Sequence, residues 1–219
     1  MSRMIINPYA FRAKIASISV FGSATSVAAS ITAPASILAG DLLVLLDRAE
    51  NLASPPPTLV TPTGFTSIGN LTDGTFARQN LSYKIADGSE SSSSITGMTG
   101  DEYVYKAMYV FRGNIAISTA SPLSVGGEAT AANPVSQTVT AGSGATPLIV
   151  LGAYSVYSDS GLSTVDPRTF STTKDGEISP NTSLYLAYKI YNGTPANTSI
   201  DMDDEGVENF LQSCYLQCA

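Results

Sequence analysis

The sequence matches itself at a spacing of 105 residues, and this internal repeat constrains the fold more than any other feature. Residues 81–88 (LSYKIADG) match residues 186–193 (LAYKIYNG), and residues 60–65 match residues 165–170 through a Val-x-Pro-x-x-Phe pattern. Two further matches follow in the same order at a spacing of 106 residues: 42–45 with 148–151, and 108–110 with 214–216. A period this long indicates duplication of a domain or half-domain, because solenoid repeats are only about 20–50 residues long.

Each copy has the pattern of β-strands. Residues 81–85 alternate between apolar and polar side chains, and residues 184–190 of the second copy alternate in the same way. Alternation with a period of two is typical of half-buried strands. Residues 42–46 (LLVLL) are apolar on both faces, which predicts a strand covered on both sides. Asp-Gly and Asn-Gly pairs, which suit tight turns, separate these runs, and we expect about five strands per copy.

These patterns predict an all-β fold. We expect one β-sandwich, jelly-roll or concanavalin-like, built from two tandem repeats of about 95–105 residues. Repeat one spans about residues 15–118, repeat two spans about 119–219, and residues 1–14 form an N-terminal arm outside the duplication. Two separate small sandwiches are the alternative. The junction at residues 113–122 does not have the composition of a flexible linker, which favours one continuous domain.

The charge balance excludes several classes of partner. The net charge is −7, which argues against a nucleic-acid groove and against binding to an anionic membrane surface. No apolar run approaches the roughly 20 residues of a membrane span, and the N-terminus does not have the pattern of a signal peptide. Charged residues make up only 13 % of the chain, against about a quarter in typical soluble proteins. The surface is therefore expected to be rich in Ser, Thr, Asn and Gly, which suits packing against a partner or against copies of the same chain.

The sequence offers little for catalysis. It contains no histidine, the commonest general base, and it lacks the Gly-x-Ser-x-Gly elbow, the P-loop and the dinucleotide fingerprint. A carboxylate pair could still hydrolyse sugars, but no spacing selects a pair among the candidates Asp101, Glu102, Asp159, Asp166 and Asp175. We therefore predict that the protein is not an enzyme and needs no cofactor.

One acidic run resembles the start of a calcium loop. Asp201, Asp203 and Glu205 occupy relative positions 1, 3 and 5, and Gly206 occupies position 6. Position 12, however, is Gln212 instead of the bidentate glutamate of such loops. These three carboxylates form a weak calcium candidate, with an exposed acidic turn as the favoured interpretation and no metal predicted.

The two cysteines are predicted to be reduced and buried. Cys214 and Cys218 lie four residues apart on one expected strand, a span of about 13 Å, whereas a disulfide needs Cα atoms within about 7 Å. The 106-residue match places Cys214 on Met108, in an apolar strand of the first copy. Both thiols are therefore expected to pack as small hydrophobic groups.

Several motifs resemble a known family. They are Gly-Asp-Leu-Leu-Val (40–44), Pro-x-Gly-Phe (62–65), Tyr-Lys-Ile-Ala-Asp-Gly-Ser-Glu (83–90) and Val-Phe-Arg-Gly (110–113), followed by a degenerate second copy. This pattern resembles duplicated β-sandwich proteins encoded among the structural genes of tailed bacteriophages and prophages, over roughly residues 19–218. The family often has Trp where Phe65 and Phe170 stand here.

The resemblance implies a non-catalytic component of a bacteriophage particle, assembled in the cytoplasm of the host bacterium. A capsid decoration or head-fibre protein is expected first, and a tail accessory protein otherwise. The implied partners are other virion proteins or further copies of the chain, without nucleic acid or membrane. A carbohydrate-binding module at a tail tip or cell surface is the alternative function, and a glycan hydrolase is a more distant one.

The N-terminal arm is the expected anchor for assembly. Ile5, Ile6, Tyr9 and Phe11 give it apolar and aromatic side chains of the kind that carry binding energy at interfaces. The alternative is that the arm adds an edge strand to its own sheet.

Overall fold

The computed structural model describes residues 17–72, 75–113, 115, 117–125, 135–139, 148–156, 168–170, 174–181, 184–192, 197–202 and 209–218. Within those ranges the chain forms strands and turns without any helix, which confirms the predicted all-β fold. The predicted arm, with Ile5, Ile6, Tyr9 and Phe11, lies outside the described residues.

The strands divide into two halves. In the first half they are β1 (Ser19–Ser26), β2 (Ser30–Thr32), β3 (Leu42–Glu50), β4 (Thr66–Thr72), β5 (Ala77–Ile85), β6 (Ser94–Thr96) and β7 (Val104–Arg112). In the second half they are β8 (Ile117–Val125), β9 (Val135–Val139), β10 (Leu148–Val156), β11 (Arg168–Phe170), β12 (Gly176–Asn181), β13 (Leu184–Tyr191), β14 (Thr198–Met202) and β15 (Asn209–Cys218). The boundary predicted between residues 118 and 119 falls within β8.

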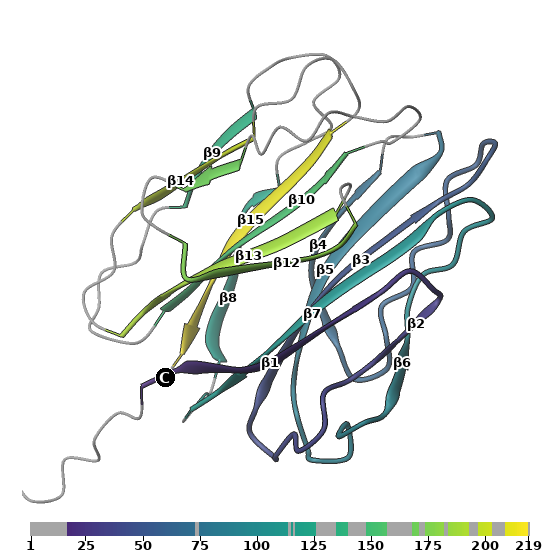
Figure 1. Cartoon of the computed structure of the whole chain (residues 1–219). Helices are drawn as coiled ribbons and strands as arrows, with labels where there is room; N and C mark the ends of the chain where they lie inside the picture. Colours follow the sequence, from purple (N-terminus) through teal and green to yellow (C-terminus); the bar gives the residue numbers. More distant parts are fainter. Residues whose placement is uncertain are drawn as a thin grey trace, which may run out of the picture.

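Two five-stranded antiparallel sheets form the body of the molecule (Figure 1). Read from β1, the first sheet has the order β1-β7-β3-β5-β4; read from β8, the second has the order β8-β15-β10-β13-β12. The two orders follow the same path, with β3 and β10 as the central strands. A duplicated unit produces a shared order of this kind, and the superposition of the two halves stays a prediction.

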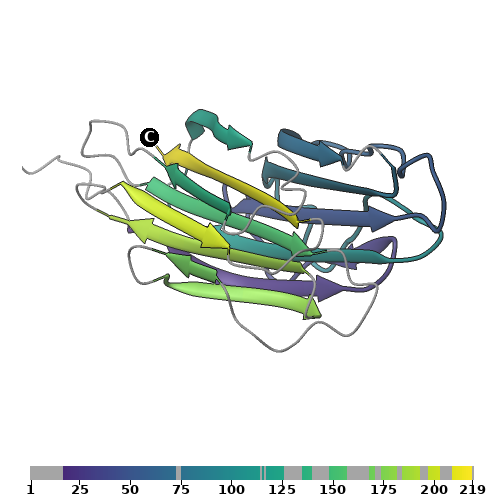
Figure 2. The ribbon, with the colours of Figure 1, turned by 90° about the horizontal axis from the view of Figure 1, so that it is seen from above.

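The inner faces of the two sheets pack against each other, which confirms the predicted β-sandwich. Val44, Leu46 and Tyr109 of the first sheet and Leu151 and Tyr188 of the second belong to one buried cluster. The Tyr188 ring meets the Tyr109 ring edge-on, with 4.7 Å between their centroids. At the sides of the sandwich β1 lies against β12 and β4 against β8, as the view from above shows (Figure 2).

Two small sheets cover the outer faces, so the molecule has four layers (Figure 1). The β2-β6 pair packs on the first large sheet, where Ile31 and Ile95 meet Leu43 and Leu45 of β3. The β11-β14-β9 sheet lies on the second. Residues 42–46 are therefore buried on both faces, as predicted. The expectation of about five strands per copy was too low, because β2 and β6 have only three residues each and give no visible alternation.

The sequence match at 106 residues is wrong by one position. Met108 faces the outer cluster of the first sheet, whereas Cys214, which was matched to it, faces the core between the sheets. Tyr109, the neighbour of Met108, faces that core as Cys214 does: Tyr109 pairs with Val44 of β3, and Cys214 pairs with Leu151 of β10. Side chains alternate between the two faces of a strand, so a slip of one residue exchanges the inner and outer faces.

The predicted burial of Cys214 is nevertheless confirmed. Its thiol is free and 1 % exposed, and burial raises its pKa to about 12. Cys218 lies in β15, but its side chain is outside the described part of the structure.

Candidate functional site

A buried ion pair lies on the outer face of the first large sheet. Asp47 of β3 and Lys106 of β7 are opposite each other in register, and both side chains are fully buried. The Met98 backbone N–H donates to Asp47 at 2.7 Å, and Lys106 donates to the Met98 carbonyl at 3.1 Å. Burial raises the pKa of Asp47 and lowers the pKa of Lys106, each against the attraction of the partner charge. Because each charge is matched by its partner and by backbone groups, the pair has a structural role.

A second polar group lies between the two large sheets. Arg48 pairs with Glu50 at 2.5 Å, and its guanidinium lies 5.1 Å from the centre of the Phe210 ring. Gln79 of the first sheet donates to Gln212 of the second at 2.8 Å. The core is therefore apolar at one end of the sandwich and polar at the other. These residues were not predicted from the sequence, although β3 continues from its apolar run directly into Asp47 and Arg48.

Of the carboxylates considered for sugar hydrolysis, Asp101 and Asp175 each bind neighbouring groups of their own half. Asp101 accepts a hydrogen bond from the Leu52 backbone at 2.7 Å. Asp175 pairs with Lys189 at 2.7 Å and accepts from the Ile190 backbone at 2.8 Å. Each holds a turn of its own half, and Asp159 and Asp166 lie outside the described residues.

The weak calcium candidate is only partly described. Asp201 lies in β14, where it pairs with Ser136 of β9 and Thr169 of β11, and Asp203 and Glu205 lie outside the described ranges. Within those ranges no three His, Cys, Asp or Glu side chains gather as metal ligands. A search of the same residues finds no helix long and apolar enough to cross a membrane.

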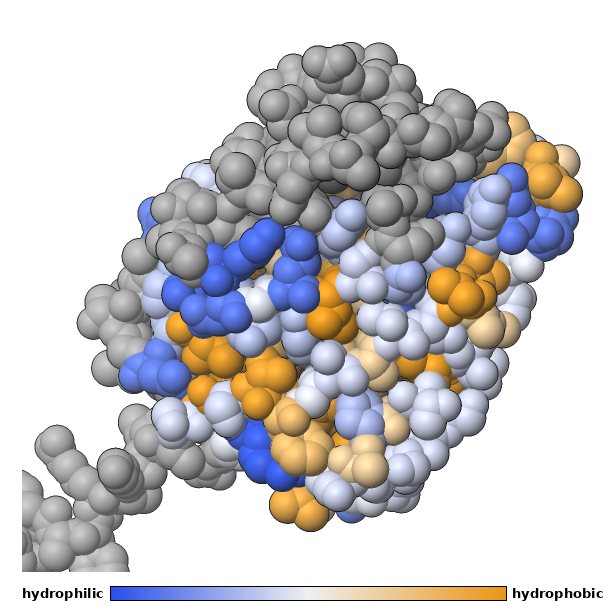
Figure 3. All heavy atoms as spheres, viewed as in Figure 1, coloured by the Kyte–Doolittle hydropathy of each residue, from blue (hydrophilic) through white to orange (hydrophobic). Residues whose placement is uncertain are grey.

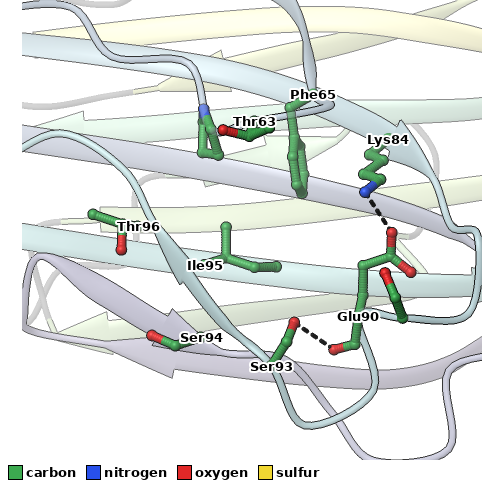
Figure 4. A pocket seen from close by; sticks show the side chains of 10 residues that line it. Thr63, Phe65, Lys84, Glu90, Ser93, Ser94, Ile95 and Thr96 are labelled. Carbon is green, nitrogen blue, oxygen red and sulfur yellow. Dashed lines mark hydrogen bonds and ion pairs between the residues drawn. The ribbon is translucent and has the colours of Figure 1, made fainter.

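An open pocket of about 350 Å³ lies at one end of the first half, between the loop before β4, the end of β5, and β6 (Figure 4). Its wall consists of hydroxyl side chains, an ion pair and three apolar groups: Pro62, Thr63, Phe65, Lys84, Ser89, Glu90, Ser93, Ser94, Ile95 and Thr96. Phe65 projects into it above Ile95, and Lys84 reaches across to Glu90 at 2.5 Å (Figure 4). The arrangement offers hydrogen-bonding groups around an apolar base, so it can contact a small polar ligand through both kinds of group.

Among the residues that line the pocket, Lys84 and Glu90 are the two charged ones and balance each other, and the exposed Asp87 carboxylate lies 3.9 Å from the Lys84 Nζ beside them. Glu90 is 5 % exposed and also accepts from the Gly88 backbone N–H at 3.1 Å. Burial raises the pKa of Glu90, but the hydrogen bonds from Lys84 and from the backbone outweigh it and hold the pKa below its ordinary value of 4.5. Glu90 is therefore a charged, fixed element of the wall and is not set up as a general acid.

Two sequence motifs meet at this pocket. Pro62 and Phe65 come from one motif, and Lys84 and Glu90 come from another about 20 residues later. Gly64 of the first motif lies close to Lys84 of the second. Its φ is +80°, and a Cβ at that position would lie 3.1 Å from the Lys84 Nζ, so glycine fits this turn with the least strain.

The other two motifs meet at an ion pair. Asp41 accepts from Arg112 Nε at 2.9 Å and from Arg112 Nη2 at 2.6 Å, and the Arg112 guanidinium stacks 3.6 Å from the centre of the Phe21 ring. This contact explains the Gly-Asp and Arg-Gly motifs as structural residues that hold β3 and β7 together.

Comparison with known proteins adds no name to this site. No protein-family model, curated protein or solved structure matches the chain. The resemblance to duplicated β-sandwich proteins of tailed phages therefore stays an interpretation of the motifs.

Proposed function

We propose that this protein is a non-catalytic structural component of a bacteriophage particle. A capsid decoration or head-fibre protein is the first form of the proposal, and a tail accessory protein is the second. The protein would act by assembly, in many copies, against other virion proteins or against itself.

The observation that carries this proposal is that charged side chains pair with one another within the fold. Six lysine and arginine side chains of the described residues pair with carboxylates of the same chain: Arg48, Lys84, Lys106, Arg112, Lys174 and Lys189. Figure 3 shows wide pale areas on the described surface of one face, between patches of strongly hydrophilic and of hydrophobic residues. The cores of protein interfaces are depleted in charged residues, so a surface of this kind suits close packing against a protein partner.

The start of the described chain supports a role for the arm. The Ile18 backbone N–H donates to the Asn192 side chain at 3.0 Å, and the Asn192 amide donates back to the Ile18 carbonyl at 3.4 Å. The residues before β1 therefore join the body at a point that is tied to the second half. We propose Ile5, Ile6, Tyr9 and Phe11 as the anchors that bind the partner.

The test is the composition of purified phage particles. Mass spectrometry of virions from a producing culture should detect the full-length chain in stoichiometric amounts. A deletion of residues 1–13 should give a folded protein, by circular dichroism and thermal melting, that no longer joins the particle. Absence of the full-length chain from the particles overturns the proposal, and normal assembly of the truncated chain overturns the role of the arm.

A carbohydrate-binding module is the second candidate function. The open neutral pocket beside Phe65 favours it.

A further inference from the structure

We infer that the pocket formed by Pro62, Phe65, Lys84, Glu90 and residues 93–96 binds a neutral carbohydrate, at the scale of a mono- or disaccharide. This inference is independent of the proposed place in a virion, because a pocket of this kind can act on a particle or on a free protein. It deepens the second candidate function by giving it a site and a ligand class.

The side chains of the pocket wall complement the surface of a sugar ring. Four hydroxyl side chains around the pocket are exposed and face solvent: Thr63, Ser89, Ser94 and Thr96. Phe65 and Ile95 supply an apolar base, since Ile95 belongs to the buried cluster under β2 and β6 and the partly buried Phe65 packs against that cluster. A sugar ring has the complementary surface, with C–H groups on its faces and hydroxyl groups around its edge. Stacking on the Phe65 ring and hydrogen bonds to the rim can therefore form at the same time.

The charges of the pocket wall favour a neutral ligand. Lys84 and Glu90 neutralise each other at 2.5 Å. An anionic or cationic ligand would have to separate this partly buried pair, with a desolvation cost for the group left alone. A neutral polyol can instead accept from Lys84 and donate to Glu90 while the pair stays intact. The pocket therefore selects against phosphates, sulfated sugars and amines.

The wall of the pocket is fixed before any ligand binds. Ser92 has a φ of 56°, in the left-handed region, and its backbone N–H donates to the Pro34 carbonyl at 3.2 Å. The Ser93 hydroxyl donates to the Glu90 carbonyl at 2.7 Å, and the Ser91 hydroxyl accepts from the Ser36 backbone at 2.7 Å. A site whose loop is already ordered loses less entropy on binding.

The second half of the molecule shows that the fold does not need this arrangement. Lys189 lies 105 positions after Lys84, and it pairs with Asp175, which precedes its own strand in the chain. Both halves build a five-stranded sheet of the same order. The position 105 residues after Glu90 is Pro195, so the repeat does not carry the Lys84–Glu90 pair into the second half.

The experiment begins with the full-length protein on a glycan array that carries neutral, sialylated and sulfated glycans. The neutral glycan with the strongest signal is then titrated by isothermal calorimetry. We expect one site per chain and a preference for neutral glycans. Phe65→Leu should weaken binding at least about fivefold through loss of ring stacking. Thr96→Val and Ser94→Ala should each weaken it about three- to tenfold through loss of one hydrogen bond.

Matched controls separate the pocket from general effects. Tyr103→Leu removes an exposed aromatic ring outside the pocket, and Thr25→Val removes an exposed strand hydroxyl on β1. Both controls should bind like the unchanged protein. Ser94 and Thr96 are exposed, so their variants remain informative even where Phe65→Leu lowers stability.

Three results overturn the inference. The first is no binding of any neutral glycan on the array or in ligand-observed NMR at millimolar sugar. The second is unchanged affinity in both Phe65→Leu and Thr96→Val. The third is a preference for anionic glycans that inorganic phosphate competes away. None of these results bears on whether the protein is present in phage particles.

Discussion

The Lys106 ammonium lies against the Asp47 carboxylate across two neighbouring strands, and neither side chain is exposed to solvent. Such a pair is costly to break from one side, because removal of one charge leaves the other buried without compensation. Lys106→Met should therefore lower the free energy of unfolding by about 3–5 kcal/mol, measured by urea denaturation.

Two further variants test that explanation. Lys189→Met breaks a partly exposed pair and should cost only about 0–1 kcal/mol. The double variant Asp47→Leu/Lys106→Met should lose less than the sum of the two single variants. Additive losses would show that the two side chains do not act as a pair.

Gly97 packs directly on that pair. A Cβ at Gly97 would lie 1.9 Å from Asp47 Oδ2, and the side chain that would have to move is fully buried. We expect Gly97→Ala to destabilise the protein by more than about 3 kcal/mol, at the upper end of single substitutions. Gly40→Ala is the control: it meets no neighbouring atom but has a φ of +90°, so it should cost about 1–2 kcal/mol. Equal thermal melting temperatures for the two variants would contradict the close approach at Gly97.

Acid should weaken the contact between Asp41 and Arg112. Burial raises the pKa of Asp41, but the hydrogen bonds from Arg112 and from the Leu38 backbone outweigh it and hold the pKa below 3.8. A carboxylate with a lowered folded-state pKa stabilises the fold above its unfolded pKa, and this stability is lost as the pH falls through the folded value. Asp41→Asn should therefore be less stable than the unchanged protein at pH 6, and the gap should narrow below about pH 4. Urea denaturation at pH 6, 4 and 3 measures the gap, and a gap that widens in acid would contradict the assignment.

Cys214 should be unreactive in the folded protein. Burial raises the pKa of its thiol to about 12, so almost no thiolate is present at pH 8, and the side chain is 1 % exposed. In a Cys218→Ser variant, a disulfide reagent should label the remaining thiol only as fast as the protein unfolds. The same variant in denaturant should react within the dead time of mixing. Rapid labelling without denaturant would place Cys214 at the surface.

The sequence predicted the parts of the fold that follow a simple period. Residues 81–85 alternate in the sequence and form part of β5, and residues 42–46 are apolar throughout and lie between two layers. The outer strands β2, β6 and β11 were missed because three residues are too few to show alternation. The match of Met108 to Cys214 failed because apolar residues occupy both faces of these strands. Similarity of type alone therefore cannot distinguish one register from the next.

The candidate site was harder to predict. The motifs that contain Phe65 and Glu90 are visible in the sequence, but their meeting depends on the antiparallel pairing of β4 with β5 and on the path of the loop that follows β5. The buried charges of β3 were not predicted either, because a charged residue normally indicates the surface, and Lys106, the partner of Asp47, comes from another strand. Long-range pairing, which no local pattern contains, decides both the pocket and the Asp47–Lys106 pair.

The strand order also has a consequence for synthesis on the ribosome. β1 pairs with β7 in one sheet, and β8 pairs with β15 in the other. The first large-sheet strand of each half therefore cannot pair until the last strand of that half has been synthesised. The first sheet can close once residue 112 has left the exit tunnel, but the face that carries Val44 and Tyr109 has nothing to pack against until β10, β13 and β15 follow. At a translation rate of about 5–20 residues per second, the nascent chain displays this apolar face for several seconds. A newly made first half is therefore the stage at which we expect chaperones to bind this protein, and a chain released early is expected to aggregate.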